Sequence, residues 1–140
     1  MTGHQDTSAA VEVVTRFLRL MEERDLVAAS RYVAPDIDIV FPGDRHFRDL
    51  KDLVESAGKR YRSVAKSIEL VDSMSNGAES VVYVIGRLSG VDAKGTGFSD
   101  VRFIDRLVVS DDLITDHRVW NDLAETGVVI GREPVEEAPG

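Results

Sequence analysis

The chain has 140 residues, enough for one domain with a substantial core, and its lack of cysteine excludes disulfides, thiolate nucleophiles and cysteine-based zinc sites. Its formal net charge of −8, from 25 acidic and 17 basic residues, argues against binding to nucleic-acid phosphates. No apolar run reaches the ~20 residues of a membrane-spanning helix, and the N-terminal residues lack the basic and apolar regions of a signal peptide. We therefore expect a soluble, cytoplasmic domain whose partners include neither nucleic acid nor a membrane.

Three helices are predicted in the first half of the chain, where apolar residues recur with a period near 3.6. The first follows a polar segment, residues 1–8, which is expected to be flexible, and it runs over residues 9–21. The second begins at the capping residue Asp25 and extends to Tyr32 or Val33, where Pro35 ends it because its ring disfavours helical geometry at the preceding residue. The third begins at another capping residue, Asp49.

After Tyr61 the apolar period changes to 2, which is typical of strands. The pair Asn76-Gly77 is the strongest hairpin signal, because both residues tolerate positive φ. The first strand of this half carries four residues on one face, namely Val64, Lys66, Ile68 and Leu70. Further strands are predicted at residues 81–88, 98–109 and 113–121, with an earlier one at 37–41 and a Gly- and Asp-rich loop at 89–97.

Helices followed by antiparallel strands indicate the α+β class. The simplest packing is one cone-shaped, curved sheet, mixed or antiparallel, wrapped around the three helices, and a cone of this kind can leave an apolar cavity. One domain is predicted over residues 9–126. The tail at 127–140 is acidic and contains two prolines, so we expect it to be disordered.

Two stretches, RFLRLMEERDLVAASRYVAPDIDIVFPG and FIDRLVVSDDLITDHRVWNDLAE, carry a resemblance that covers about Ala9 to Ala124. They resemble the nuclear transport factor 2-like superfamily, particularly its SnoaL-like branch of polyketide cyclase-like and ketosteroid isomerase-like proteins. The second stretch looks like the family's closing hairpin, in which the residue at the position of Asp105 points into the cavity. The resemblance implies the cone fold but leaves function open, because that fold carries isomerases, cyclases, epoxide hydrolases, dehydratases and non-catalytic adaptors.

The resemblance transfers catalytic residues only in part. Asp105 falls where ketosteroid isomerases hold a neutral carboxylic acid. Phe17 and Phe41, however, take the places of their oxyanion-hole tyrosine and general-base aspartate. Val119 takes the place of the essential aspartate of SnoaL-type cyclases and limonene-epoxide hydrolases. The resemblance therefore implies neither dienone isomerisation nor a direct copy of those two mechanisms.

The last two strands suggest a catalytic pair, Asp105 and His117. If the turn is centred on Asp111, paired residue numbers sum to about 222, which sets Asp105 directly opposite His117 with Cβ atoms ~4.5–5.5 Å apart. Asp105 would orient the imidazole and stabilise its charged form, while His117 exchanges a proton with a substrate. Alternatively, the pair is a satisfied polar contact at the sheet edge, and a register slip of one residue would turn His117 to the opposite face.

Other residues are expected to line the cavity and bind the ligand. Four apolar side chains form pocket wall or plain core: Phe17, Phe41, Phe103 and Val119. Asn121, near the rim, could hydrogen-bond a ligand carbonyl or cap the chain where it leaves the sheet. His46 could reach the cavity mouth or be a solvated loop histidine, and Tyr61 could donate its phenol to the site.

The opposite face of the last strands predicts a homodimer, because tryptophan and arginine are enriched at interface hot spots and sheet-to-sheet dimers are common in the resembling family. This face carries Arg102, Ile104, Arg106, Arg118 and Trp120. In the alternative reading, Trp120 packs under the C-terminal segment.

No cofactor or metal is predicted. The stretch GVDAKGTG has neither the spacing nor the strand-to-helix context of a phosphate-binding loop, and the three histidines lack metal-ligand spacing. The leading interpretation is a small cofactor-independent enzyme that performs acid/base chemistry (isomerisation, cyclisation, dehydration or epoxide opening) on an apolar carbonyl or epoxide compound. The alternative is a non-catalytic module of the same fold that binds an apolar ligand or acts as a dimeric scaffold.

Overall fold

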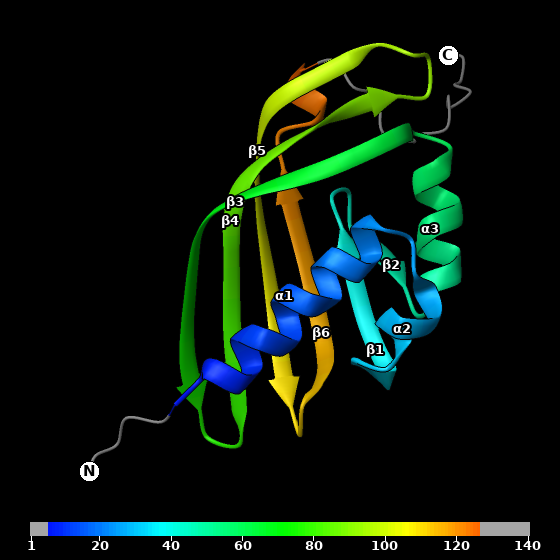
Figure 1. Cartoon of the computed structure of the whole chain (residues 1–140). Helices are drawn as coiled ribbons and strands as arrows, with labels where there is room; N and C mark the ends of the chain where they lie inside the picture. Colours follow the sequence, from blue (N-terminus) through cyan, green and yellow to red (C-terminus); the bar gives the residue numbers. More distant parts are fainter. Residues whose placement is uncertain (1–5, 127–140) are drawn as a thin grey trace.

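A computed structural model describes residues 6–126 of the chain (Figure 1). The predicted tail at 127–140 and most of the segment predicted to be flexible, residues 1–5, lie outside the described residues. The elements are α1 (Ser8–Glu22), α2 (Leu26–Ser30), β1 (Val33–Phe41), β2 (Arg45–Phe47), α3 (Leu50–Gly58), β3 (Tyr61–Asn76), β4 (Glu79–Asp92), β5 (Gly97–Ser110), β6 (Leu113–Asn121) and a 3-10 turn (Ala124–Thr126).

The predicted caps of the shorter helices are confirmed, since Asp25 and Asp49 each accept a hydrogen bond from a backbone N–H in the first turn, at 3.2 and 3.0 Å. The end predicted for α2 is wrong, because the helix stops at Ser30 and Pro35 lies within β1. The chain is extended from Val33 onwards because this segment pairs with β6. No helix in residues 6–126 is long and apolar enough to cross a membrane.

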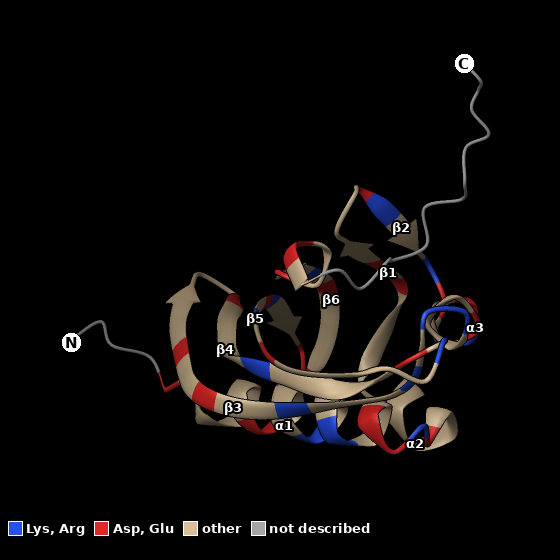
Figure 2. Ribbon diagram, turned by 90° about the horizontal axis from the view of Figure 1, so that it is seen from above, with Lys and Arg blue, Asp and Glu red and all other residues tan. Residues whose placement is uncertain are grey.

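The six strands form one mixed sheet in the order β2-β1-β6-β5-β4-β3, in which only the β1–β6 pair is parallel. The sheet curves around α1, which lies across its concave face (Figures 1 and 2). The core lies between them, where Val14 and Phe17 of α1 are fully buried together with Val82, Val84 and Leu107 of the sheet. The predicted α+β class and cone-shaped sheet are therefore confirmed.

The loop predicted at 89–97 is wrong, because β4 continues to Asp92 and β5 begins at Gly97. Glycine suggested a loop there, but Gly90 lies inside a strand, where a Cβ atom would overlap the carbonyl oxygen of Ser63 on β3. Gly86 stands in the same relation to Ser67. Glycines at such close approaches let a sheet bend sharply, so they shape the cone. The short strand β2 was also not predicted.

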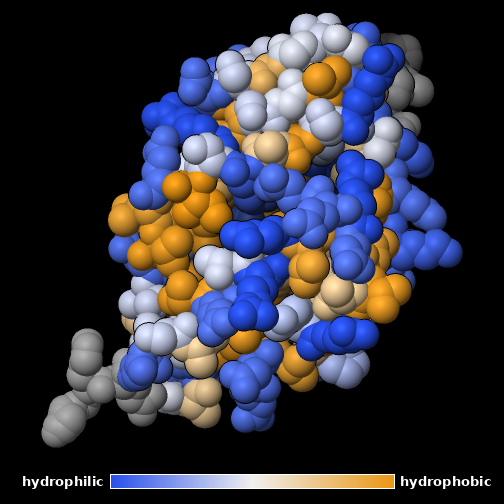
Figure 3. Space-filling model, in the orientation of Figure 1, coloured by the Kyte–Doolittle hydropathy of each residue, from blue (hydrophilic) through white to orange (hydrophobic). Residues whose placement is uncertain are grey.

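The edge strand β3 follows its predicted alternation only in part. Val64, Lys66 and Ile68 pair with residues of β4 in one unbroken register, but the register shifts between Ile68 and Leu70. Leu70 therefore turns to the outer face and is 49% exposed. Apolar atoms are visible along the β3 side of the molecule in Figure 3.

Candidate functional site

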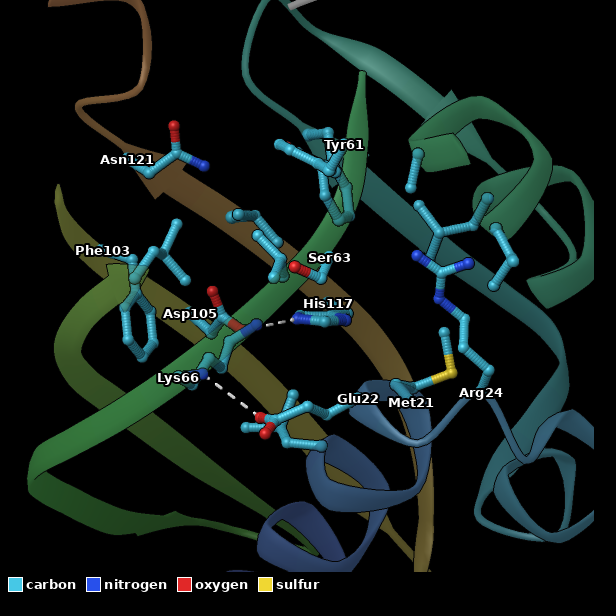
Figure 4. Close-up of a pocket in the computed structure, with 18 of the residues that line it drawn as sticks. Met21, Glu22, Arg24, Tyr61, Ser63, Lys66, Phe103, Asp105, His117 and Asn121 are labelled. Carbon is cyan, nitrogen blue, oxygen red and sulfur yellow. Dashed lines mark hydrogen bonds and ion pairs between the residues drawn. The ribbon is translucent and has the colours of Figure 1, made fainter. Parts of the chain in front are cut away.

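A cavity of about 320 Å³ lies between the concave face of the sheet and the helices α1 and α3 (Figure 4). Its wall is largely apolar and includes Phe17, Leu53, Leu88, Phe103 and Val119. Polar side chains enter this wall from β3, β5 and β6. Six of the predicted site residues other than the Asp105–His117 pair line it, namely Phe17, Phe41, Tyr61, Phe103, Val119 and Asn121.

The cavity brings Asp105 and His117 together. Nε2 of His117 lies 3.2 Å from Oδ2 of Asp105, and the two residues are only 4% and 1% exposed. The predicted opposition of the two residues is nevertheless wrong, since Asp105 lies opposite Val119 while His117 lies opposite Leu107. The pair is diagonal across β5 and β6, two residues away from the predicted register.

The geometry of the β5–β6 hairpin explains why the predicted register is wrong and why Asp105 and His117 are nevertheless in contact. Asp111 and Asp112 both have positive φ, as a two-residue hairpin turn requires, so residue numbers paired next to the turn sum to 223. A bulge then inserts Thr115, because Val109 pairs with Ile114 while Val108 pairs with Asp116. The sum becomes 224 beyond the bulge. Without this extra residue His117 would face outward, because side chains alternate along a strand.

Asp105 is a buried carboxylate held in its ionised form. Burial, the largest single influence, raises the pKa of Asp105, but the ammonium of Lys66 and the contact with His117 outweigh it, and the net pKa is lowered. Nζ of Lys66 lies 3.9 Å from Oδ2 of Asp105. Neither Oδ1 of Asp105 nor Nδ1 of His117 has a hydrogen-bond partner among the described residues, and both atoms are buried.

The sequence analysis did not identify Lys66 as a site residue. Period-2 alternation placed Lys66 on the same strand face as Val64 and other apolar residues. We gave it no role because a lysine on an edge strand is ordinarily exposed to solvent. The available signal was the charge itself, since a cation on the inward face of a strand needs an acceptor. Asp105 lies 39 positions further along the chain, so no local pattern joined the two.

Aromatic rings enclose His117. The rings of Phe17 and Phe41 meet the imidazole edge-on, at centroid distances of 5.9 and 6.4 Å. Tyr61 lies higher in the cavity, beside Phe98, and burial raises the pKa of its phenol. Tyr61 therefore remains a neutral hydrogen-bond donor at physiological pH.

Two predicted ligand-binding residues have other contacts. Asn121 lines the cavity, but its side-chain oxygen also accepts the backbone N–H of Leu123 at 3.1 Å, so it caps the exit from β6 as well. His46 is outside the cavity, which corrects its prediction as a residue of the mouth. Its two ring nitrogens lie 3.0 Å from Asp38 and 3.0 Å from Asp44 on the exposed β1–β2 hairpin, and those carboxylates raise the pKa of the imidazole.

The convex face of the sheet exposes apolar and cationic side chains together. Trp120 is 53% exposed and Ile104 is 40% exposed. The arginines around them are paired within the chain, Arg102 with Asp122 at 2.6 Å, and Arg106 and Arg118 with Asp116 at 3.6 and 3.0 Å. This face thus combines an exposed indole with three guanidinium groups that share two carboxylates of the same chain.

No protein-family model matches the sequence, and no curated protein matches it either. Solved structures do match the fold. An NTF2-like protein of unknown function from Burkholderia pseudomallei is 15% identical, with 89% of this chain and 98% of that chain covered and a TM-score of 0.70. TerC, co-crystallised with polyporic acid, is 14% identical, with 87% and 98% covered and a TM-score of 0.68. A candidate SnoaL-like polyketide cyclase from Jannaschia is 18% identical, with 99% and 98% covered and a TM-score of 0.64.

These similarities confirm the fold expected from the resemblance to the nuclear transport factor 2-like superfamily and its SnoaL-like branch. At identities below one fifth they establish the fold alone, because this architecture carries many unrelated activities. Function has to be argued from the residues in the cavity.

Proposed function

We propose that this protein binds a small, largely apolar organic molecule in its conical cavity and transfers a proton to or from it through His117 and Asp105. The observation that carries the proposal is the buried 3.2 Å contact between these two residues in the wall of an apolar cavity. Perturbed titratable groups in such a cavity favour a functional site.

The geometry supports a distinct role for each member of the pair. Asp105 is the ionised partner, so Nε2–H of His117 donates to it and this contact fixes the tautomer of the ring. Nδ1 is then the atom that accepts a proton from a carbon or oxygen of the ligand. The resulting imidazolium is stabilised by the adjacent carboxylate, and it returns the proton to another atom of the ligand. The net reaction is an isomerisation, a cyclisation, a dehydration or the opening of an epoxide.

Two of the similar structures support a small organic ligand over a macromolecular one. TerC was co-crystallised with polyporic acid, and the Jannaschia protein is a candidate polyketide cyclase. Both proteins are similar to this chain in fold. We use the polyporic acid of TerC only as a guide to the class of ligand, a small organic molecule.

A non-catalytic binding module of the same fold is the second candidate. It is favoured by Phe17, Phe41 and Val119, which stand where the resembling enzymes place polar catalytic groups. Such a module would use the cavity wall for affinity and the polar pair only as an anchor.

Exchange of hydrogen for deuterium separates the two candidates without knowledge of the natural reaction. Cyclic ketones with an acidic α-hydrogen would first be screened for binding by thermal shift. Each binder would then be incubated with the protein in D₂O, and deuterium next to the carbonyl would be measured by mass spectrometry. Wild-type protein should accelerate exchange, while Asp105→Asn and His117→Gln should reduce it by about 10²-fold or more.

The exposed histidine supplies a matched control for this experiment. His46→Gln removes an imidazole that lies outside the cavity, so exchange should be unchanged. If binding ketones exchange no faster with wild type than with His117→Gln, proton transfer is excluded and the binding module is left.

A homodimer through the convex face is also part of the proposal. It is supported by the half-exposed Trp120 and by the arginines around it, each of which already has a carboxylate partner in its own chain, which lowers the cost of burying them.

A further inference from the structure

Lys66 places an ammonium group in the cavity with its hydrogen-bond donors unused. Nζ lies 3.9 Å from Oδ2 of Asp105, which is close enough for ionic attraction but beyond the roughly 2.7–3.2 Å of a hydrogen bond. It lies 5.2 Å from the centre of the Phe103 ring, and the side chain is only 23% exposed. Figure 4 shows this group beside Asp105 and His117. No acceptor for it is found within residues 6–126.

The wider charge balance of the cavity is also opposite to that of the chain. The cationic residues in its wall are Arg24, Arg62 and Lys66, and the anionic ones are Glu22 and Asp105. Of the two acids, Glu22 already accepts the backbone N–H of Lys66 at 3.2 Å, and Asp105 is bound to His117. A chain with a net charge of −8 thus has one more cationic than anionic residue in the wall of this cavity. Such local fields favour ligands of the opposite sign.

We infer that the natural ligand is an amphipathic organic acid, ionised at neutral pH, whose anionic oxygen binds Nζ of Lys66. The inference rests on the proposed function, because it takes the cavity as the ligand site and names the class of ligand. The apolar body lies against Phe17, Leu88 and Phe103, while the carboxylate or acidic enol accepts from the ammonium. A charge-assisted hydrogen bond of this kind is about twice as strong as a neutral one. It also orients the ligand with one end beside His117.

A matched pair of fluorescent probes tests the inference. 8-Anilinonaphthalene-1-sulfonate and N-phenyl-1-naphthylamine share the same rings, but only the first carries an anionic group. Both would be titrated into the full chain at pH 7. The sulfonate is expected to bind more tightly, and Lys66→Met should weaken it about tenfold or more, the loss expected for one hydrogen bond to a charged group. The neutral probe should change by less than about threefold, because methionine keeps the volume of the lysine stem.

Three further variants isolate the contact from general charge effects. Lys51→Met removes an exposed cation of α3 outside the cavity. It should bind the two probes as wild type does. Lys66→Met combined with Asp105→Asn keeps the net charge of wild type and should still bind the sulfonate weakly. Thermal melts confirm that each variant is folded, and Lys66→Arg should retain the preference.

The outcomes separate the two proposals. If neither probe binds the wild-type cavity, the proposed function falls and the inference falls with it. If both bind and Lys66→Met weakens them equally, only the inference is overturned. An equal loss in Lys51→Met, or recovery of sulfonate binding in the double variant, would also overturn it, because the preference would then reflect net charge.

Discussion

Replacement of Lys66 by methionine should destabilise the protein through Asp105. Asp105 is 1% exposed, and of the charged groups around it Lys66 has the strongest influence on its pKa. Methionine keeps the length and most of the apolar surface of the lysine side chain. Within residues 6–126 it leaves the buried carboxylate with His117 as its only polar partner. Removing one partner of a buried ion pair is costly because the other remains desolvated.

The distance between the charges sets the scale of the effect. Unit charges 3.9 Å apart attract by about 4 kcal/mol at an effective dielectric constant near 20 and by about 1 kcal/mol in water. Lys66 is neither fully buried nor solvated, at 23% exposed. We therefore expect Lys66→Met to lower the free energy of unfolding by about 1–4 kcal/mol at pH 7.

Urea denaturation of four proteins measures this coupling: wild type, Lys66→Met, Asp105→Asn and the double variant. Most of the cost of Lys66→Met should disappear when Asp105 is already asparagine, since no charge is then left unpaired. A coupling energy below about 0.5 kcal/mol would refute the reasoning, because it would mean that the ammonium does not hold the carboxylate in its charged form.

The difference in stability between wild type and Asp105→Asn should also depend on pH, in a direction set by the pKa of Asp105. The pKa of Asp105 is lower in the folded chain than the value of about 3.9 for an unfolded aspartate. Its contribution to stability is therefore fully present above that unfolded pKa and is lost as pH falls toward the folded pKa. The difference in stability between wild type and Asp105→Asn should be constant near neutrality and should shift against wild type on acidification below about pH 4.

Three other predictions concern the frame around the site. Gly86→Ala should destabilise the fold by about 1–3 kcal/mol or more in thermal melts, because the added Cβ would overlap the Ser67 carbonyl. Gly58 of α3 has open space around it, so as a control Gly58→Ala should be neutral or stabilise the fold by about 0.5–1 kcal/mol. Phe17→Ala should cost about 3–5 kcal/mol in urea denaturation, since the ring is fully buried against His117. Trp120→Glu should convert a dimer into a monomer in light scattering at micromolar concentration, and a wild-type mass already equal to one chain would end the dimer proposal.

The parts of the fold that depend on local signals were predictable. Asp25 and Asp49 cap helices because a short side-chain oxygen can reach the orphan N–H groups of the first turn, and that reach is visible in sequence. The inward direction of Asp105 follows from period-2 alternation along β5. The end of α2 was not predictable in this way, since Val33 is drawn into the sheet by β6, a strand 80 positions further on.

The prediction that Asp105 and His117 are in contact was correct although the predicted register was wrong by two residues. Two irregularities, each worth one residue, add up to an even number and therefore leave the side chains on the same face. The predicted sum of 222 differs from the observed 224 by one residue in the turn and one in the bulge at Thr115. An even error leaves every side chain on its predicted face, whereas either irregularity alone would have reversed His117. Sequence alternation thus predicted which face the residue occupies, while the identity of its directly opposite neighbour depended on turn and bulge geometry.

The position of Lys66 required the curvature of the whole sheet. Lys66 pairs with Leu88, which pairs with Val101, so in a flat sheet Lys66 would lie level with Val101. Asp105 is four residues further along β5, which together with two strand spacings would separate the Cα atoms of Lys66 and Asp105 by about 16 Å. The observed 3.9 Å between Nζ and Oδ2 therefore depends on β3 bending over the concave face, as it does in Figure 1. Gly86, on β4, permits that bend, because any side chain there would overlap the backbone of β3. A single glycine inside a predicted strand thus allows the cation to reach the carboxylate.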